Sequence, residues 1–394
     1  MEAYEKNLFK LNAYSFFQTF LVLIPIIVPY WQGKGLTLHE IFLLQGIFGF
    51  TLIAFDLPAG YAADLLGRKK MLLIGSLISA FGFQILWFGE TFLHFAIYEV
   101  ILAIGLSFQS GCDVAILYST LEKLSLNKRT AQYLGRRMTA NTMGEGVASL
   151  LGGALALISL SLPAYVTAIT ACIPFCIALT VFEPEEKRLP RESHIHNMIQ
   201  IKKALFGHSW FLTFIIFNFI FYGFATYCAV WSLQPFWQEK GIPIYMFGYL
   251  WAANSFIVAL VSRFAHTIEE KLGPIKVILF ISILPIVGYF GMSLKWGLWS
   301  LIFLIAFPLC RGLNQVLFQD AINSRVPSEI RATTNSVGSL GMRALFIVFG
   351  PWLGHVIDLH GVAPAMMMMG WVYVAGLFCI AMPLLSQRKE FKIN

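Results

Sequence analysis

Seven ionisable side chains lie inside long apolar stretches of this chain. They are Asp56, Glu99, Asp113, Glu145, Arg311, Asp320 and Arg343. A charge in such surroundings costs about 2.5 to 3.5 kcal/mol on membrane-insertion scales and is rarely retained without a role. Buried acids can bind and release protons, and an arginine can hold a carboxylate or phosphate through two parallel hydrogen bonds. These residue types therefore predict proton exchange and anion binding.

Three acids in the first half of the chain are candidates for proton exchange. Glu99 and Asp113 belong to one apolar run, and an unbroken helix would place them about 21 Å apart along its axis and ~40° apart around it. Asp113 and Glu145 fall at similar depths in neighbouring runs, and two acids at one depth can share a proton. The alternatives are a structural ion pair with Arg136 or Arg137 for Asp113 and Glu145, and a packing role for Glu99.

In the second half the charges inside apolar runs are mainly positive. Arg311 shares a helical face with Gln315, and Asn335 shares one with Arg343 on the eleventh run. A guanidinium that faces water in a cavity is suited to an anionic ligand group. The expected binding residues are Arg311, Arg343, Asn141, Asn335 and Gln315. The alternative for the arginines is a structural pair with an acid, for which Asp320 is one candidate.

Twelve apolar runs must position these side chains, each near the ~20 residues that cross a bilayer. Their approximate bounds are 11–31, 39–63, 71–89, 93–120, 134–158, 162–182, 209–236, 244–265, 275–294, 297–323, 333–357 and 363–385. With 58% hydrophobic and 12% charged residues, the composition excludes an ordinary soluble domain. We expect an all-α membrane protein with bundles at 1–182 and 209–394. The charged segment 183–208 contains two prolines and is predicted to be a cytosolic linker.

The placement of positive charge predicts topology. Of the 28 Lys and Arg residues, 22 fall on the termini, on the even-numbered connections or within the first four residues of the runs that follow those connections, against 3 on the odd-numbered side. By the positive-inside rule both termini are cytosolic, as in a bacterial inner (cytoplasmic) membrane. The net charge of +7 is therefore attributed to the lipid bilayer as partner and not to nucleic acid.

Enzyme chemistry and a metal site find no support in the sequence. All six cysteines lie inside apolar runs, so neither a disulfide framework nor a metal-ligand pattern is expected. There is no Gly-Lys-Ser/Thr nucleotide loop and no clustered histidine or catalytic triad. We expect a monomer without a cofactor that is not an enzyme.

One loop between the second and third runs combines glycines, an acid and three cations: Gly60-Tyr-Ala-Ala-Asp64-Leu-Leu-Gly67-Arg68-Lys-Lys. It resembles the signature loop of the major facilitator superfamily in both spacing and residue type. The resemblance implies two six-helix bundles that open alternately to either side of the membrane. It also implies a gate, in which Asp64, Gly67 and Arg68 hold one state and Arg68 reaches an acid at the end of the fourth helix. Glu122 matches that acid by position, and Asp56 is expected to extend the network.

Internal repeats support the same architecture independently. Arg137-Met-Thr-Ala-Asn141-Thr-Met-Gly in the fifth run aligns with Arg331-Ala-Thr-Thr-Asn335-Ser-Val-Gly in the eleventh. Equivalent helices that recur six positions later indicate two parallel six-helix repeats. We therefore expect a secondary active transporter, proton-coupled, for a small organic anion, zwitterion or amphiphile as its small-molecule substrate. The alternative is a multidrug/proton antiporter that exports lipophilic compounds.

Overall fold

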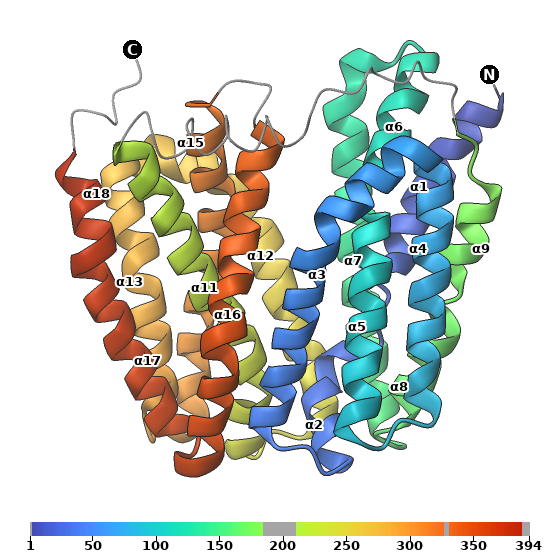
Figure 1. Cartoon of the computed structure of the whole chain (residues 1–394). Coiled ribbons are helices and arrows are strands. Elements are labelled where there is room, and N and C mark those ends of the chain that lie inside the picture. The colour runs from blue at the N-terminus through green and yellow to red at the C-terminus, as the bar shows by residue number, and fades with distance from the viewer. Residues whose placement is uncertain (1, 184–209, 327–330, 388–394) are drawn as a thin grey trace. The chain divides into compact units, whose positions relative to one another are not determined.

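The structure, a computed structural model, describes residues 2–183, 210–326 and 331–387, without the side chains of residues 2–3, 57, 64 and 331–336. All regular elements in these ranges are helical (Figure 1). The predicted all-α fold class is therefore confirmed. Apart from Glu183, the predicted linker lies outside the described residues.

The chain divides into two compact units, each described by itself. One contains Met1–Leu189 and Ile242–Ala253, and the other contains Pro190–Gly241 and Asn254–Asn394. The first unit is built from α1 (Glu2–Gln18), η1 (Ile24–Ile26), α2 (Ile27–Gly33), α3 (Leu38–Leu66), α4 (Arg68–Phe83), η2 (Gln84–Trp87), α5 (Phe92–Gln109), α6 (Cys112–Lys123), η3 (Asn127–Arg129), α7 (Thr130–Ala156), α8 (Leu162–Thr170), α9 (Ile173–Thr180) and the start of α12 (Ile244–Leu272).

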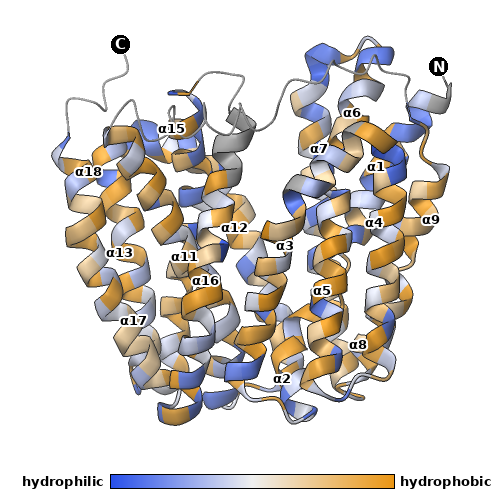
Figure 2. Ribbon diagram, viewed as in Figure 1, coloured by the Kyte–Doolittle hydropathy of each residue, from blue (hydrophilic) through white to orange (hydrophobic). Residues whose placement is uncertain are grey.

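The second unit contains the rest of α12 and the later helices. These are α11 (Trp210–Glu239), α13 (Pro274–Ser293), η4 (Gly297–Ile305), α14 (Ala306–Leu313), the π-helix η5 (Asn314–Phe318), α15 (Gln319–Asn323), α16 (Arg331–His360), α17 (Val362–Gly376), the π-helix η7 (Leu377–Ala381) and α18 (Met382–Ser386). Figure 2 shows apolar residues along most of the helix length, with polar residues gathered toward helix ends.

Ten helical segments in the described ranges are long and apolar enough to span a membrane. They coincide with ten of the twelve predicted runs. The first run is interrupted after Gln18, ahead of Pro25 and Pro29. The fifth run forms α7, which carries Arg137 and Glu145 along its length. The helix arrangement is thus consistent with twelve spans, two of which are too broken or too polar to meet a simple hydropathy criterion.

The fourth run departs from the expectation of one unbroken helix. It forms α5 and α6, separated at Ser110 and Gly111. Gly111 has φ +72°, a left-handed conformation that glycine adopts without steric cost and that ends a regular helix. The angular relation predicted between Glu99 and Asp113 on a continuous helix is therefore wrong, because the two acids lie on different helical segments.

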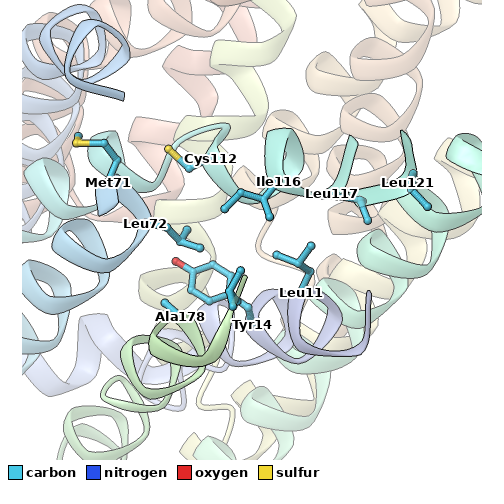
Figure 3. Packing of buried hydrophobic residues seen from close by; sticks show 10 residues of the cluster. Leu11, Tyr14, Met71, Leu72, Cys112, Ile116, Leu117, Leu121 and Ala178 are labelled. Atoms are coloured by element: carbon cyan, nitrogen blue, oxygen red, sulfur yellow. The ribbon is translucent and has the colours of Figure 1, made fainter. Parts of the chain in front are cut away.

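A buried cluster joins the helices of the first unit around α6. It consists of Leu11, Tyr14, Met71, Leu72, Cys112, Ile116, Leu117, Leu121, Ala178 and Val181. Figure 3 shows Tyr14 among side chains contributed by other helices. In a membrane, such contacts stabilise through van der Waals packing, because lipid offers no hydrophobic driving force between helices. The cluster fixes α6, and with it the acid in its first turn.

Close contacts also fix α7 against α1 and the segment that follows α1. A Cβ atom on Gly144 would collide with the carbonyl oxygen of Phe16, and one on Gly152 would collide with that of Val22. Small residues at such positions let two helix backbones approach closely. The Thr19 hydroxyl also donates to the Asn141 carbonyl oxygen at 2.8 Å. These contacts set the rotation of α7 about its own axis.

Candidate functional site

A buried ion pair lies at the start of α6 in the first unit. Asp113 is only 4% exposed, and its Oδ2 accepts from Arg137 Nε at 2.7 Å and lies 2.5 Å from Arg137 Nη2. Both guanidinium nitrogens therefore contact one carboxylate oxygen, in a charge-assisted contact. Among the described residues Arg137 is the side-chain partner of Asp113, so no direct hydrogen bond joins Asp113 to Glu99 or Glu145. Of the possibilities left open for Asp113, the structure contains the ion pair.

Two local features hold Asp113 in place. It occupies the first turn of α6 directly after Gly111, where a negative charge is favoured by the free backbone N–H groups of a helix start. On the other side of the break, Gln109 joins four neighbours. Its Oε1 accepts from Tyr14 at 2.6 Å and from Gln18 at 3.0 Å, and its Nε2 donates to Ser79 Oγ at 2.8 Å and to the Gly105 carbonyl at 3.1 Å.

Arg137 belongs to a polar row on α7. Arg137, Asn141 and Glu145 follow one another at intervals of four and therefore share one helix face. The Asn141 Oδ1 atom is buried and has no hydrogen-bond partner in the described part of the chain. Glu145 Oε1 accepts from Trp251 Nε1 at 3.1 Å. The face thus presents a paired cation, an unsatisfied amide oxygen and an acid bound to an indole.

Glu99 lies elsewhere in the same unit, on α5. It is 4% exposed, and its Oε1 accepts from Gln45 Nε2 on α3 at 2.7 Å. A buried carboxyl group with one amide donor remains able to take a proton. Its partner Gln45 is itself buried. Sequence reasoning missed Gln45, although a single amide within the run 39–63 was a visible signal.

The arginines of the second unit stand on helices whose other faces are packed. Arg311 is exposed while its neighbours Cys310 and Gly312 are buried. Gln315, one turn further, is also exposed and lies in the π-helix η5, an element often found at functional sites. Arg343 on α16 is half-buried. Neither arginine has an ion-pair partner among the residues described, and Asn335 has no described side chain.

The signature loop contains a contact that the sequence did not suggest. Gly67 joins α3 to α4 with φ +97°, and Glu183 Oε1 accepts from the backbone N–H of Lys69 at 3.2 Å. The carboxyl group of Glu183 therefore satisfies a free donor at the start of α4. The neighbouring Phe182 is held by Asn7, whose side chain donates to its carbonyl at 2.6 Å and accepts from its N–H at 2.9 Å.

The other predicted gating residues are placed less completely. Arg68 Nη1 donates to Ser119 Oγ at 3.3 Å, one turn before Glu122 on α6. Glu122 is exposed and Asp56 is half-buried, and neither has an ion-pair partner within the described ranges. The side chain of Asp64 lies outside them. The gate remains a prediction.

Comparison with known proteins gives similarities that cover most of the chain. The family model described as Major Facilitator Superfamily matches residues 11–351. An uncharacterized MFS-type transporter of Methanocaldococcus jannaschii is 23% identical over 374 residues, covering 91% of this chain and 93% of that protein. A class H tetracycline resistance protein of Pasteurella multocida is 22% identical, covering 76% of each chain.

A solved structure shows the same fold. The nucleoside transporter NupG, in the form of a single-residue mutant, superposes with a TM-score of 0.81 at 15% identity, covering 96% of this chain and 99% of that one. At this identity the likeness shows fold alone.

Proposed function

This chain belongs to the Major Facilitator Superfamily of membrane transporters, and we propose that it is a proton-coupled secondary active transporter. Its substrate in this proposal is a small organic anion, zwitterion or amphiphile, moved by alternating access. The proposal includes no catalytic step and no cofactor. Both termini face the cytosol of a bacterial inner membrane, as the distribution of lysine and arginine supports.

The observation that carries the proposal is the buried Asp113–Arg137 pair. Removing the charge of one partner leaves the other buried and uncompensated, which is strongly unfavourable. A proton on Asp113 therefore releases Arg137 to bind another anion, and an anion on Arg137 favours a proton on Asp113. Proton and anion then bind together, which is the requirement for coupled movement in one direction. The unsatisfied Asn141 Oδ1 lies one turn away and can accept from a donor group of the same substrate.

The remaining predicted residues have supporting roles. Glu145 and Glu99 are further proton acceptors, each with one neutral donor in contact. In the second unit, anion binding is assigned to Arg311, Arg343, Gln315 and Asn335. The exposed position of Arg311 beside the packed face of α14 supports this assignment, because an arginine kept for structure would be expected to have an acidic partner.

The direct test is transport by purified protein in proteoliposomes under an imposed proton gradient. Radiolabelled lactate, benzoate and glutamate serve as anionic probes, and ethidium serves as a cationic one. Asp113→Asn is expected to abolish gradient-driven accumulation of the transported probe and to retain at least a third of the exchange between internal and external probe. Glu90→Gln removes an exposed acid of the same unit and should behave as wild type. Unchanged accumulation by Asp113→Asn would exclude Asp113 as the coupling acid.

The alternative, a multidrug/proton antiporter, is favoured by the likeness to the tetracycline resistance protein. An antiporter of this kind differs from the first proposal in the charge of its substrate, and its protons move in the opposite direction to the substrate. Export of ethidium that releases protons into the vesicle, together with resistance of expressing cells to lipophilic cations, would support it. If ethidium is exported in this way and none of the anionic probes is taken up, the antiporter proposal replaces the first one.

A further inference from the structure

A cavity of about 200 Å³ lies within the second unit, and neither of the arginines assigned to the substrate is among its lining residues. Its walls come from α11, α12, α13, η5 and α15, near the turn at Gly273 that joins α12 to α13. Phe211, Ile278 and Phe318 are among its apolar lining residues. An engineered cavity of about 150 Å³ holds benzene, so this one is large enough for a small aromatic molecule.

Three charged side chains line the same cavity: Glu269, Asp320 and Arg325. Glu269 Oε2 is 3.8 Å from His266 Nδ1, a long contact between partly exposed groups. Asp320 is exposed and has no ion-pair partner in the part of the chain that the structure describes. Two acids therefore line the cavity together with one arginine, Arg325, whose charge acts on Glu269 as that of His266 does.

Among the described residues that line the cavity, the one cation is already engaged. The Arg325 guanidinium carbon lies 5.1 Å from the centre of the Phe211 ring, and Nη1 donates to the Ala321 carbonyl at 2.9 Å. Stacking on the ring and the carbonyl contact hold this cation against the wall. The other charged groups at the cavity are acidic and most of its lining is apolar. These surroundings suit a cation with a hydrocarbon body.

We propose that this cavity is a second binding site, which takes a small primary ammonium compound with an aromatic or short hydrocarbon body. The ammonium group binds Glu269 and Asp320, and the body packs between Phe211 and Phe318. The same ammonium chemistry occurs in free amines and in the ethanolamine headgroup of lipids. The site is separate from the proposed transport residues, so its test does not depend on transport.

The test uses the full chain in nanodiscs made of phosphatidylglycerol only, with binding followed by saturation-transfer NMR. Phenethylamine is the probe, with 2-phenylethanol and 3-phenylpropionate as neutral and anionic counterparts. We expect saturable phenethylamine binding with a dissociation constant on the order of 1 mM, as suits a ligand of about nine heavy atoms. The neutral and anionic counterparts should bind at least tenfold more weakly.

Variants locate the site. Glu269→Gln and Asp320→Asn should each weaken phenethylamine binding at least tenfold, and Ala321→Phe should block it by filling the cavity. Glu270→Gln is the matched control, since it removes the adjacent exposed acid that does not line the cavity. The thermal unfolding midpoint of each variant shows that it is folded.

The outcomes separate the two sources of the ammonium group. Loss of phenethylamine binding when phosphatidylethanolamine is added supports the site with a lipid headgroup as its occupant, and unchanged binding supports it with a free amine. Absence of saturable binding in phosphatidylglycerol nanodiscs overturns the proposal. Equal weakening by Glu270→Gln, or equal affinity for 3-phenylpropionate, overturns it as well.

Discussion

Asp113 and Arg137 form a pair whose members depend on each other. The carboxyl group is buried, and the guanidinium side chain is 19% exposed. Such a pair contributes little net stability compared with apolar residues, but loss of one partner leaves an unpaired buried charge. The proposed coupling role assigns this pair a function other than stability.

Arg137→Ala is expected to destabilise the protein by about 3 to 5 kcal/mol, because it leaves Asp113 buried and uncompensated. Unfolding of the purified protein by increasing SDS, followed by tryptophan fluorescence, measures the change. The double variant Asp113→Asn with Arg137→Gln should recover more than half of the loss. Arg136→Ala is the control, because Arg136 is exposed and lies over the Tyr133 ring. Equal losses of unfolding free energy for Arg136→Ala and Arg137→Ala would show that the Asp113–Arg137 pair contributes no more to stability than an exposed arginine.

The sequence identified the acids of this site but not all of their partners. Hydrophobic run length sets the depth of a residue in the membrane, which is why Asp113 and Glu145 could be named. Depth does not set which neighbouring helix a side chain faces, so the pairing with Arg137 stayed one of several alternatives. The contacts of Glu99 with Gln45 and of Glu145 with Trp251 depend on helix rotation, which tertiary packing decides.

At the scale of elements, α7 is the helix on which the candidate site depends most. Gly144 sets its distance from α1, and Arg137, Asn141 and Glu145 lie on the same side of the helix. A change that pushes α7 away from α1 would also move Arg137 relative to Asp113. Packing and site geometry are therefore coupled through one rigid helix.

Gly144→Ala is expected to lower the free energy of unfolding by about 1 to 3 kcal/mol, since the added methyl group meets the Phe16 carbonyl. The same SDS titration measures it. Gly146→Ala is the matched control on the same helix, because a Cβ atom there has open space. It should be neutral or stabilising by up to ~1 kcal/mol through helix propensity. Comparable destabilisation by both variants would contradict the proposed close contact.

The break between α5 and α6 shows why an element can differ from its sequence pattern. The run 93–120 is predominantly apolar, and isolated glycines inside such a run are tolerated in many helices. Here the four contacts of Gln109 hold the end of α5, and Gly111 takes the left-handed conformation that lets α6 begin anew. Three of the contacts come from α1 and α4, so no local pattern could predict them.

At the scale of the whole molecule, membrane topology is the property most open to test. We predict that green fluorescent protein fused to the C-terminus fluoresces and that alkaline phosphatase fused there is inactive, since both termini are expected in the cytosol. Alkaline phosphatase inserted after Lys240, on an odd-numbered connection, should be active. Phosphatase activity at the C-terminus would reverse the proposed orientation.

The all-α membrane fold and the family were predictable because hydrophobic length and the signature loop are local properties of the chain. The attachment of Glu183 to the loop was not, since it joins the end of the sixth run to the start of the third through a backbone N–H. Contacts of that kind leave no compositional trace, because any acid on a polar segment would look the same.

One feature of the first unit bears on the order of biosynthesis. The segment Ile244–Ala253 belongs to that unit although α11 precedes it in the chain. It supplies Trp251 to Glu145, and Gly248 to a close backbone contact with Gly153. When a ribosome has released residues 1–189, one face of α7 therefore still lacks its partner. The first unit reaches its final form only after α12, the second span to follow, has left the insertion machinery, so its last assembly step must wait for synthesis to enter the other half.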